Sequence, residues 1–353
     1  PSHRVGEVVH LMQEADGRVF AADLRLVNRR LRRELFETVA GFFLDHPRRL
    51  GRADPAASTL ALLELADTGA GGDVPDLAPA LWFFVGKERS FRWSRTAGGL
   101  SVTGLPGEAD LARLVAPVVA DMQHPGRTVV ESALSRLADV LLGPLGDHWA
   151  AGRTLHLAPD GVLHAVPWAL LPLPVPGGGF EPALTRGPVR ELARTREPPR
   201  GSSPPGGRLL AIGDDRTLAG GEELRRAEAE ARALAARWPS TQVDLRLGAV
   251  ADDLTEDDFV GRDVIHIASH ARCREGLGYR ATVRFAAGVP LTATGVARRR
   301  LDADLMVLSC CEADRPLAAG GVGSFARACL EAGARTVIAS SQRVDDEAAA
   351  ELA

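Results

Sequence analysis

Two reactive side chains follow two apolar runs of the sequence. Cys311 comes directly after MVLSC, and His270 stands near the end of DVIHIASHA, where the small residue Ala271 follows it. Adjacent parallel strands lie about 4.8 Å apart, so two such strand ends bring an imidazole within reach of a sulfur. A neighbouring histidine takes the thiol proton or raises the fraction of thiolate, which is the attacking form of cysteine. The pattern therefore indicates nucleophilic chemistry at Cys311.

Other cysteines and histidines of this region have competing interpretations. Cys310 faces the opposite side of its strand, and we expect it to pack. His266, His270 and Cys273 are spaced four and three residues apart, which would suit zinc on a helix. The neighbouring valine and isoleucines favour a strand, on which residues four apart lie roughly 13 Å from each other. We therefore expect no metal and no other cofactor, and we expect His164 and His266 to be packing or hydrogen-bonded side chains.

The segments around the reactive residues alternate between apolar runs and helical patterns. Helices are expected over 222–238 and 324–334, and the expected strands are RLLAIGDD (208–215), QVDLRLG, DVIHIASHA, DLMVLSCCEAD and RTVIASS. Buried strands that alternate with helices predict an α/β fold with a mainly parallel sheet and helices on both faces. The ligand site of such a sheet forms at the carboxyl ends of the strands, where His270 and Cys311 stand.

The preceding part of the chain divides into a helical segment, a smaller α/β half and a linker. In the helical segment, 1–75, apolar residues recur at three- and four-residue steps: Leu24, Val27, Leu31 and Leu35. We expect this stripe to pack on the α/β body. The other faces, which we expect to be solvated, carry Arg25, Arg29, Arg32 and Arg33.

The smaller α/β half is expected over 77–196. Its expected strands lie within 81–93, on both sides of a turn at Gly86–Lys87, and at 99–105 and 154–161, and its helices at 108–122 and 128–142. The segment EPPRGSSPPGG (197–207) is rich in Pro, Gly and Ser and reads as a linker. The catalytic half then spans 208–353.

Composition excludes several classes of protein. The 353 residues are 45% apolar and 25% charged, which is typical of a globular chain of two or three domains. The net charge of −4 gives no general attraction to nucleic acid or to an anionic membrane. No uninterrupted apolar run reaches the roughly 18 residues that span a bilayer. We therefore expect neither direct nucleic-acid binding nor membrane insertion.

Residue usage also indicates origin and compartment. Of the 42 basic residues only Lys87 is a lysine, which suggests a GC-rich bacterial genome. Cys310 and Cys311 are adjacent and make a poor disulfide framework, so a reducing cytoplasm is expected. The first residue is Pro1 and the last residues are EAAAELA, so we expect the chain to be a fragment of a longer protein.

From about residue 153 to 353 the sequence resembles the CHAT domain, a caspase-like peptidase module of clan CD often found behind tetratricopeptide repeats in bacteria. The matching segments, in order, are LHLAPDGVLHAVPWALLP, LLAIGDD, EAEARAL, DVIHIASHA, PLTATGV, LMVLSCCEA, and AGARTVIAS followed by VDDEAAA. The resemblance implies a caspase-like fold for 208–353 and a pseudo-protease-like half for 77–196. Residues 1–75 would then be the tail of a helical repeat array.

The resemblance also implies roles for individual residues. Cys311 would be the nucleophile and His270 its general acid/base, with the oxyanion held by the backbone N–H groups of Ala271 and Cys311. The loop after the first strand of the domain would line the S1 pocket, and this loop begins with Asp214 and Asp215. Carboxylates there would favour a basic P1 residue. The alternative is that Asp214 caps its own turn.

These expectations converge on a cysteine endopeptidase that cleaves protein substrates and is held inactive until a regulatory partner acts on the upstream helical repeats. One alternative is a catalytically silent scaffold that binds protein. Another is a nucleic-acid-binding module using 24–33, which the net charge disfavours. The sequence departs from the family at Gln342, where a tryptophan is common, and at Ala353, which precedes the family's last helices.

Overall fold

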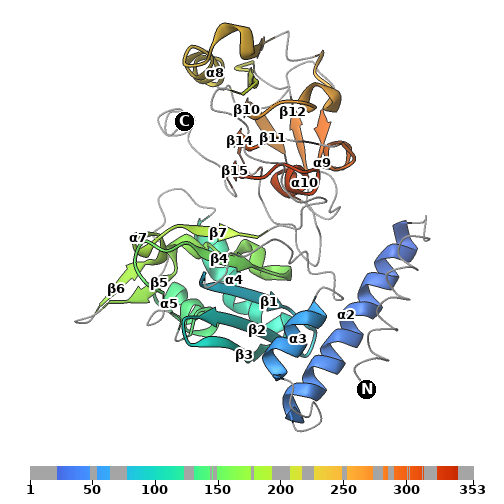
Figure 1. Cartoon of the computed structure of the whole chain (residues 1–353), viewed down its shortest axis with the longest axis vertical. Coiled ribbons are helices and arrows are strands. Elements are labelled where there is room, and N and C mark those ends of the chain that lie inside the picture. The colour runs from blue at the N-terminus through green and yellow to red at the C-terminus, as the bar shows by residue number, and fades with distance from the viewer. Residues whose placement is uncertain are drawn as a thin grey trace. The chain divides into compact units, whose positions relative to one another are not determined.

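The computed structural model describes most of the chain in two compact units, Pro1–Leu192 and Ala193–Ala353 (Figure 1). The boundary between them falls just before the predicted linker at 197–207. The described residues are 22–47, 54–63, 78–122, 131–143, 145, 149–175, 179–192, 207–216, 226–248, 253–272, 281–284, 290–299, 301, 303–311, 313 and 324–340.

The first unit is built on a mixed sheet with the strand order β3-β2-β1-β4-β7. Its strands are β1 (Ala80–Phe84), β2 (Arg89–Thr96), β3 (Gly99–Pro106), β4 (Leu155–Ala158) and β7 (Val189–Glu191). The first three form an antiparallel meander, while β4 runs parallel to both β1 and β7. The short elements at the far end of the unit are β5 (Pro172–Pro174), β6 (Phe180–Pro182) and α7 (Ala183–Arg186), together with the single 3-10 turns η3 (Gly161–Ala165) and η4 (Trp168–Leu170).

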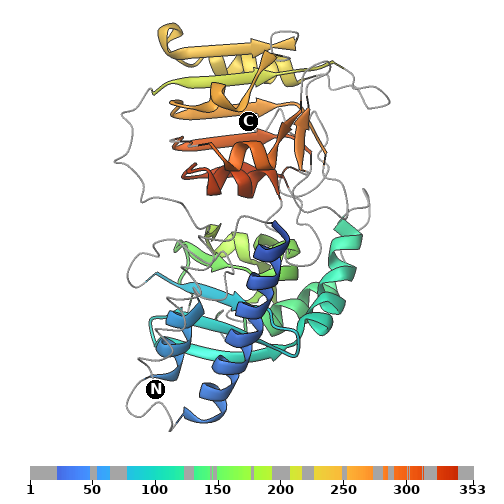
Figure 2. The ribbon, with the colours of Figure 1, turned by 90° about the vertical axis from the view of Figure 1, so that its right-hand side faces the viewer.

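Helices cover both faces of this sheet. On one face α4 (Glu108–Met122) and α5 (Glu131–Leu141) bury apolar side chains such as Leu111 and Leu137. On the other face α2 (Ala22–Asp45) and α3 (Pro55–Leu63) lie side by side in both views (Figures 1 and 2). The helices predicted at 108–122 and 128–142 are thus confirmed within the described residues.

Helix α2 packs through a different face from the one its leucines predict. Leu31 and Leu35 are 54% and 42% exposed, whereas Phe36 and Ala40 are buried. The ring of Phe36 lies 4.6 Å from that of Phe84 in the sheet, centroid to centroid, which fixes the rotation of the helix. The prediction that the leucine stripe packs is therefore wrong for Leu31 and Leu35. The side chains of Leu24 and Val27 lie outside the described residues.

Polar contacts fix the same face of α2 on the first unit. Arg33 donates to both carboxylate oxygens of Asp160, at 3.1 and 2.5 Å, and to the carbonyl oxygen of Val85 at 2.8 Å. The carboxylate of Glu37 accepts the backbone N–H groups of the β1–β2 turn, residues 87–89. Arg32 is 6% exposed. The expectation of a solvated arginine face is therefore wrong for Arg32 and Arg33.

The second unit contains the parallel sheet that the sequence predicts. Its strand order is β15-β14-β10-β8-β9, and every neighbouring pair is parallel. The strands are β8 (Leu209–Gly213), β9 (Val243–Leu247), β10 (Val264–Ala268), β14 (Leu305–Ser309) and β15 (Val337–Ala339). Figure 2 shows the strands stacked in the order β15-β14-β10-β8-β9. A small antiparallel sheet follows β10 and consists of β11 (His270–Arg272), β12 (Thr282–Arg284) and β13 (Leu291–Thr292).

The two faces of the parallel sheet are covered by different helices. On one face Ile265, Ile267 and Leu308 pack in a core that includes α9 (Ala293–Ala297) and α10 (Phe325–Glu331). On the other face α8 (Ala227–Ala235) packs on Leu209 and Ala211. Because successive side chains of a strand point to opposite faces, residues of even number on β10 and odd number on β14 face α8. The predicted α/β fold with helices on both faces of a mainly parallel sheet is confirmed.

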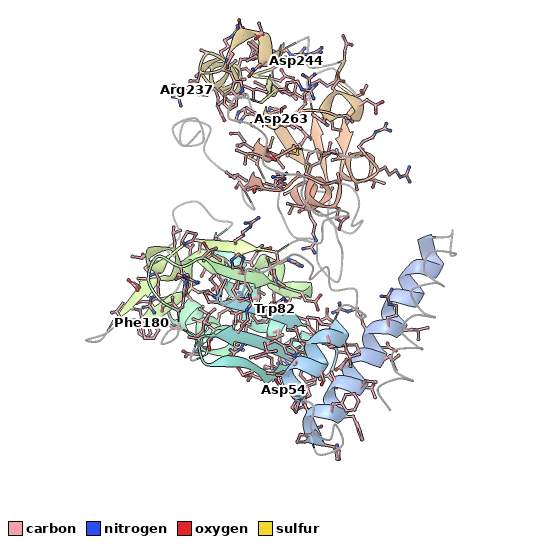
Figure 3. The ribbon with its side chains drawn as sticks, viewed as in Figure 1. Asp54, Trp82, Phe180, Arg237, Asp244 and Asp263 are labelled. Carbon is pink, nitrogen blue, oxygen red and sulfur yellow. The ribbon has the colours of Figure 1, made fainter. Side chains whose placement is uncertain are left out.

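The amino ends of three strands are joined around Asp263, which is labelled in Figure 3. The Asp263 carboxylate accepts the backbone N–H of Arg208 at 2.6 Å, and its carbonyl oxygen accepts the N–H of Asp304 at 2.7 Å. At this edge the polar groups therefore serve to align the starts of β8, β10 and β14. The opposite edge, at the carboxyl ends, carries the reactive side chains.

Candidate active site

The strands that precede His270 and Cys311 are neighbours in the parallel sheet. The register of β10 and β14 runs from Val264 opposite Leu305 to Ala268 opposite Ser309. His270 and Cys311 each come two residues after this last pair. The two side chains therefore leave the same edge of the sheet from adjacent strands, which are about 4.8 Å apart.

The sequence predicts that His270 ends the strand DVIHIASHA. In the structure this strand ends earlier, at Ala268. The chain bends at Ser269, and His270 opens β11, in which it pairs with Arg284 of β12. The bend has a simple cause. Both parallel neighbours of β10 end in the same row, at Gly213 and Ser309, so the backbone beyond it needs another partner for its N–H and C=O groups.

The two adjacent cysteines have different environments. Cys310 is 4% exposed, and its thiol donates to the carbonyl oxygen of Ile267 at 3.4 Å. Burial raises the pKa of Cys310 to about 12, so this sulfur stays a thiol near neutral pH. Cys311 is partly exposed. The prediction that Cys310 packs is confirmed, and Cys311 is the cysteine of the pair that solvent reaches.

The predicted oxyanion and pocket residues come shortly after the carboxyl ends of strands of the parallel sheet. Ala271 pairs with Val283 in the small antiparallel sheet and is partly buried. Asp214 and Asp215 follow β8 directly. Since β8 is the other neighbour of β10, these aspartates start from the same carboxyl edge as His270.

Both aspartates bond to groups of their own surroundings. Asp214 is 1% exposed, and its two oxygens accept from Arg216 Nε at 2.8 Å and Nη2 at 3.0 Å. The Asp215 carboxylate accepts the backbone N–H of Glu228 near the start of α8 at 2.6 Å. The Asp214 carboxylate also accepts the backbone N–H of Arg216. These contacts agree with the alternative in which Asp214 caps its own turn. The role of Asp214 and Asp215 in substrate binding stays a prediction.

A buried polar cluster lies on the α8 face of the sheet. Glu230 of α8 is 8% exposed, and its Oε1 lies 3.0 Å from Nε2 of His266, which is 2% exposed. The hydroxyl of Ser309 donates to Oε2 of Glu230 at 3.2 Å. The expectation that His266 is a packing or hydrogen-bonded histidine is confirmed for its packing, since the side chain is buried against the Glu230 carboxylate. In the alternative zinc site His266 would share an ion with His270 and Cys273, whereas its contact here is a carboxylate. Cys273, the third residue of that alternative, lies outside the described residues.

Comparison with protein families decides the classification, because a family model of the CHAT domain matches residues 131–353. The chain belongs to the CHAT family. No curated protein matches the chain.

Several landmarks of the CHAT domain can be placed on the fold. LLAIGDD begins within β8, EAEARAL forms most of α8, and DVIHIASHA supplies β10 and the start of β11. LMVLSCCEA supplies β14 and the turn that carries Cys311. The landmarks thus build the carboxyl edge of the sheet after which His270 and Cys311 follow. Gln342 and VDDEAAA lie outside the described residues.

The sequence interpretation missed Glu230, which belongs to the buried polar cluster on the α8 face of the sheet. A signal was present, because Glu230 lies three residues after Ala227 and four before Leu234, on the apolar stripe of α8. A carboxylate on the buried stripe of a helix indicates a polar partner inside, and here the partners are His266 and Ser309.

Two searches of the described residues gave no candidates. No described group of three or more His, Cys, Asp or Glu side chains is arranged to hold a metal ion. None of the described helices has both the length and the apolar character needed to cross a bilayer.

Proposed function

We propose that this CHAT domain is a cysteine endopeptidase in which Cys311 is the nucleophile and His270 the general acid/base. The observation that carries the proposal is the register of β10 and β14, since both residues come two positions after the paired residues Ala268 and Ser309. The partial exposure of Cys311 beside a buried Cys310 supports the assignment. Caspase-like peptidases place their reactive residues in the same manner, at the ends of neighbouring strands.

The chemistry follows from these two side chains. His270 accepts the proton of the Cys311 thiol while the sulfur attacks the carbonyl carbon of the scissile peptide bond. The negative charge that develops on the carbonyl oxygen is stabilised by the backbone N–H groups of Cys311 and Ala271. The C–N bond then breaks, the amine leaves with the proton held by His270, and a thioester to Cys311 remains.

Water completes the cycle. His270 accepts a proton from the water molecule that attacks the thioester carbon, the C–S bond breaks, and the sulfur leaves as a thiol or thiolate while the product departs as a carboxylic acid. No electron is transferred to or from an external donor in either step. The reaction therefore needs the substrate, water and the two side chains.

We propose a protein as substrate and a reducing bacterial cytoplasm as the compartment, and we propose that a partner acting through upstream helices regulates the enzyme. A thiol nucleophile suits a reducing compartment, and none of the described cysteines Cys310, Cys311 and Cys329 is in a disulfide. The docking of α2 onto the first unit through Arg33 and Glu37 supports a role for the N-terminal helices as part of the folded protein.

A covalent thiol probe tests the proposal. At neutral pH, an iodoacetamide probe should label Cys311 in the wild type faster than in His270→Ala, and Cys311→Ala should lose this labelling. Cys310→Ala is the matched control and should be labelled like the wild type, since burial raises the pKa of Cys310 to about 12. Equal labelling rates in wild type and His270→Ala, together with no peptide hydrolysis, would favour a scaffold that binds protein without cleaving it.

A further inference from the structure

Glu230 is a buried carboxylate that the proposed reaction does not use. Its side chain is 5% exposed and lies between helix α8 and the parallel sheet. One oxygen contacts His266 of β10, and the other accepts a hydrogen bond from Ser309 of β14. A carboxylate placed in this way loses much of its hydration, and contacts on both of its oxygens offset that cost.

Small residues let the helix carry Glu230 so close to the sheet. The last row of the α8 face across three strands consists of Gly213, Ala268 and Ser309. A Cβ atom on Gly213 would lie 2.5 Å from the carbonyl oxygen of Ala227, so only glycine permits this approach without a shift of the helix. Asp215 holds the same end of α8 through the backbone N–H of Glu228.

The two partners of Glu230 belong to the two strands that lead to the reactive pair. His266 precedes His270 by four residues, and Ser309 precedes Cys311 by two. Their side chains lie on the same face of the sheet because both contact Glu230. One carboxylate therefore bridges the middle of β10 and the last residue of β14.

The influence of Glu230 extends to the turn that carries the nucleophile. Its negative charge is one of the causes that raise the pKa of Cys310, after burial and the neighbouring Cys311. The buried carboxylate therefore acts on the end of β14 in two ways, through its charge and through its hydrogen bond to Ser309.

We propose that Glu230 is a positioning residue for the His270–Cys311 pair, because it joins β10 to the end of β14 through His266 and Ser309. The effect of Glu230 on catalysis rests on the proposed function. The positioning itself concerns the separation of two strand ends, and that separation can be measured without any substrate. Loss of the bridge loosens that separation, and small errors in the placement of reacting groups slow an enzyme strongly.

A disulfide cross-link measures the separation directly. In a His270→Cys variant, diamide can oxidise the new thiol and Cys311 to a disulfide, and mass spectrometry identifies the linked peptides. Disulfides form when Cα atoms lie about 4.4–6.8 Å apart, a range that includes neighbouring strands. In this background, Glu230→Ala should slow formation of the link by about tenfold or more.

Two variants of the same helix serve as controls. Glu230→Gln keeps an oxygen for Ser309 and an amide for His266, and it should restore the cross-linking rate to near that of the parent. Glu228→Gln removes a charge that pairs with Arg232 at 3.6 Å, and it should leave the rate unchanged. A folded Glu230→Ala protein that cross-links as fast as the parent would overturn the proposal, and so would a Glu230→Gln protein as slow as Glu230→Ala.

Ser309→Ala decides the question if Glu230→Ala fails to fold, since it removes only the bond to β14 from a partly exposed position. We expect cross-linking to slow several-fold, and in the enzyme with His270 intact we expect kcat to fall while KM stays the same. An unchanged rate in both assays would overturn the proposal.

The substrate-free assay separates failure of this inference from failure of the proposed function. If the wild type cleaves no peptide but cross-linking still depends on Glu230, the peptidase assignment fails and the bridge stands. If the parent His270→Cys protein forms no link to Cys311, the two side chains do not lie side by side and both proposals fail.

Discussion

The thiol of Cys310, the residue immediately before the proposed nucleophile, donates a hydrogen bond to the carbonyl oxygen of Ile267 inside the sheet. This bond joins β14 to β10 on the face opposite α8. The two strands are thus connected on both faces near their carboxyl ends, by Cys310 on one face and by Glu230, which contacts His266 and Ser309, on the other.

Replacement of the two cysteines should separate catalysis from packing. Cys311→Ala is expected to abolish peptide hydrolysis and to change the free energy of unfolding by no more than about 1 kcal/mol, because the side chain is partly exposed. Cys310→Ala should keep hydrolytic activity but lower stability by about 1 kcal/mol, because it removes a buried side chain. The measurements are hydrolysis of a labelled peptide mixture and urea unfolding. Full activity in Cys311→Ala would refute the peptidase proposal.

Removal of Arg33 should loosen helix α2 from the first unit. Arg33→Ala leaves the carboxylate of Asp160, which is 4% exposed, with the backbone N–H of Val85 and without its cation. We expect a loss of about 2–4 kcal/mol in the stability of the docked helix and faster cleavage by trypsin near its ends. Glu34→Ala, at the neighbouring exposed position, is the control and should be cleaved like the wild type. Rapid loss of the helix from the wild type itself would show that the docking is weak in solution.

Neutralising Asp214 should affect stability more than specificity. Asp214→Asn removes the charge that bonds to Arg216 through two oxygens, and we expect unfolding to become easier by about 1–3 kcal/mol. The P1 preference, measured with a peptide library, should not change. Asp253→Asn, exposed in the same unit, should leave both properties alone. A loss of preference for basic P1 residues in Asp214→Asn would instead support the pocket role that the sequence predicts.

His156 should make the stability of the first unit depend on pH. Burial lowers its pKa below the ordinary value of 6.5, and the positive charges of Arg190 and Arg95 add to this effect. The unfolded chain therefore binds a proton at a higher pH than the folded one. Stability is full above about pH 7 and falls as the pH drops through the lower pKa of the folded state.

A neutral replacement tests this dependence. His156→Gln should flatten the decline of the unfolding free energy as the pH falls below about 7. Thermal or urea unfolding at several pH values gives the slope for each protein. An identical slope in the variant and the wild type would mean that His156 is not the group responsible.

The alternation of strands and helices was predictable because each element buries a continuous apolar surface. Ile265, Ile267 and Leu308 lie in the core of the sheet, and the apolar runs that contain them predict β10 and β14. That the strands before His270 and Cys311 are neighbours followed from the same pattern. The division of DVIHIASHA into β10 and β11 at Ser269 could not be predicted, because β11 pairs with β12, which lies further along the chain.

The burial of charged side chains was harder to predict for the same reason. Arg33 is drawn onto the first unit by Asp160, 127 residues away in the sequence. Glu230 is buried because Gly213 lets its helix approach, and its partners come from two later strands. Local patterns give the apolar face of a helix, but the rotation of that helix depends on partners that the pattern does not contain.

The opposed environments of Cys310 and Cys311 have a consequence for oxidative damage. Consecutive Cα atoms are about 3.8 Å apart, closer than the roughly 4.4 Å that an ordinary disulfide requires, and Cys310 is held in the core by Ile267. If peroxide converts Cys311 to a sulfenic acid, its neighbour is in no position to resolve it. Recovery of this cysteine through Cys310 is thereby blocked, and a thiol from elsewhere must reduce it.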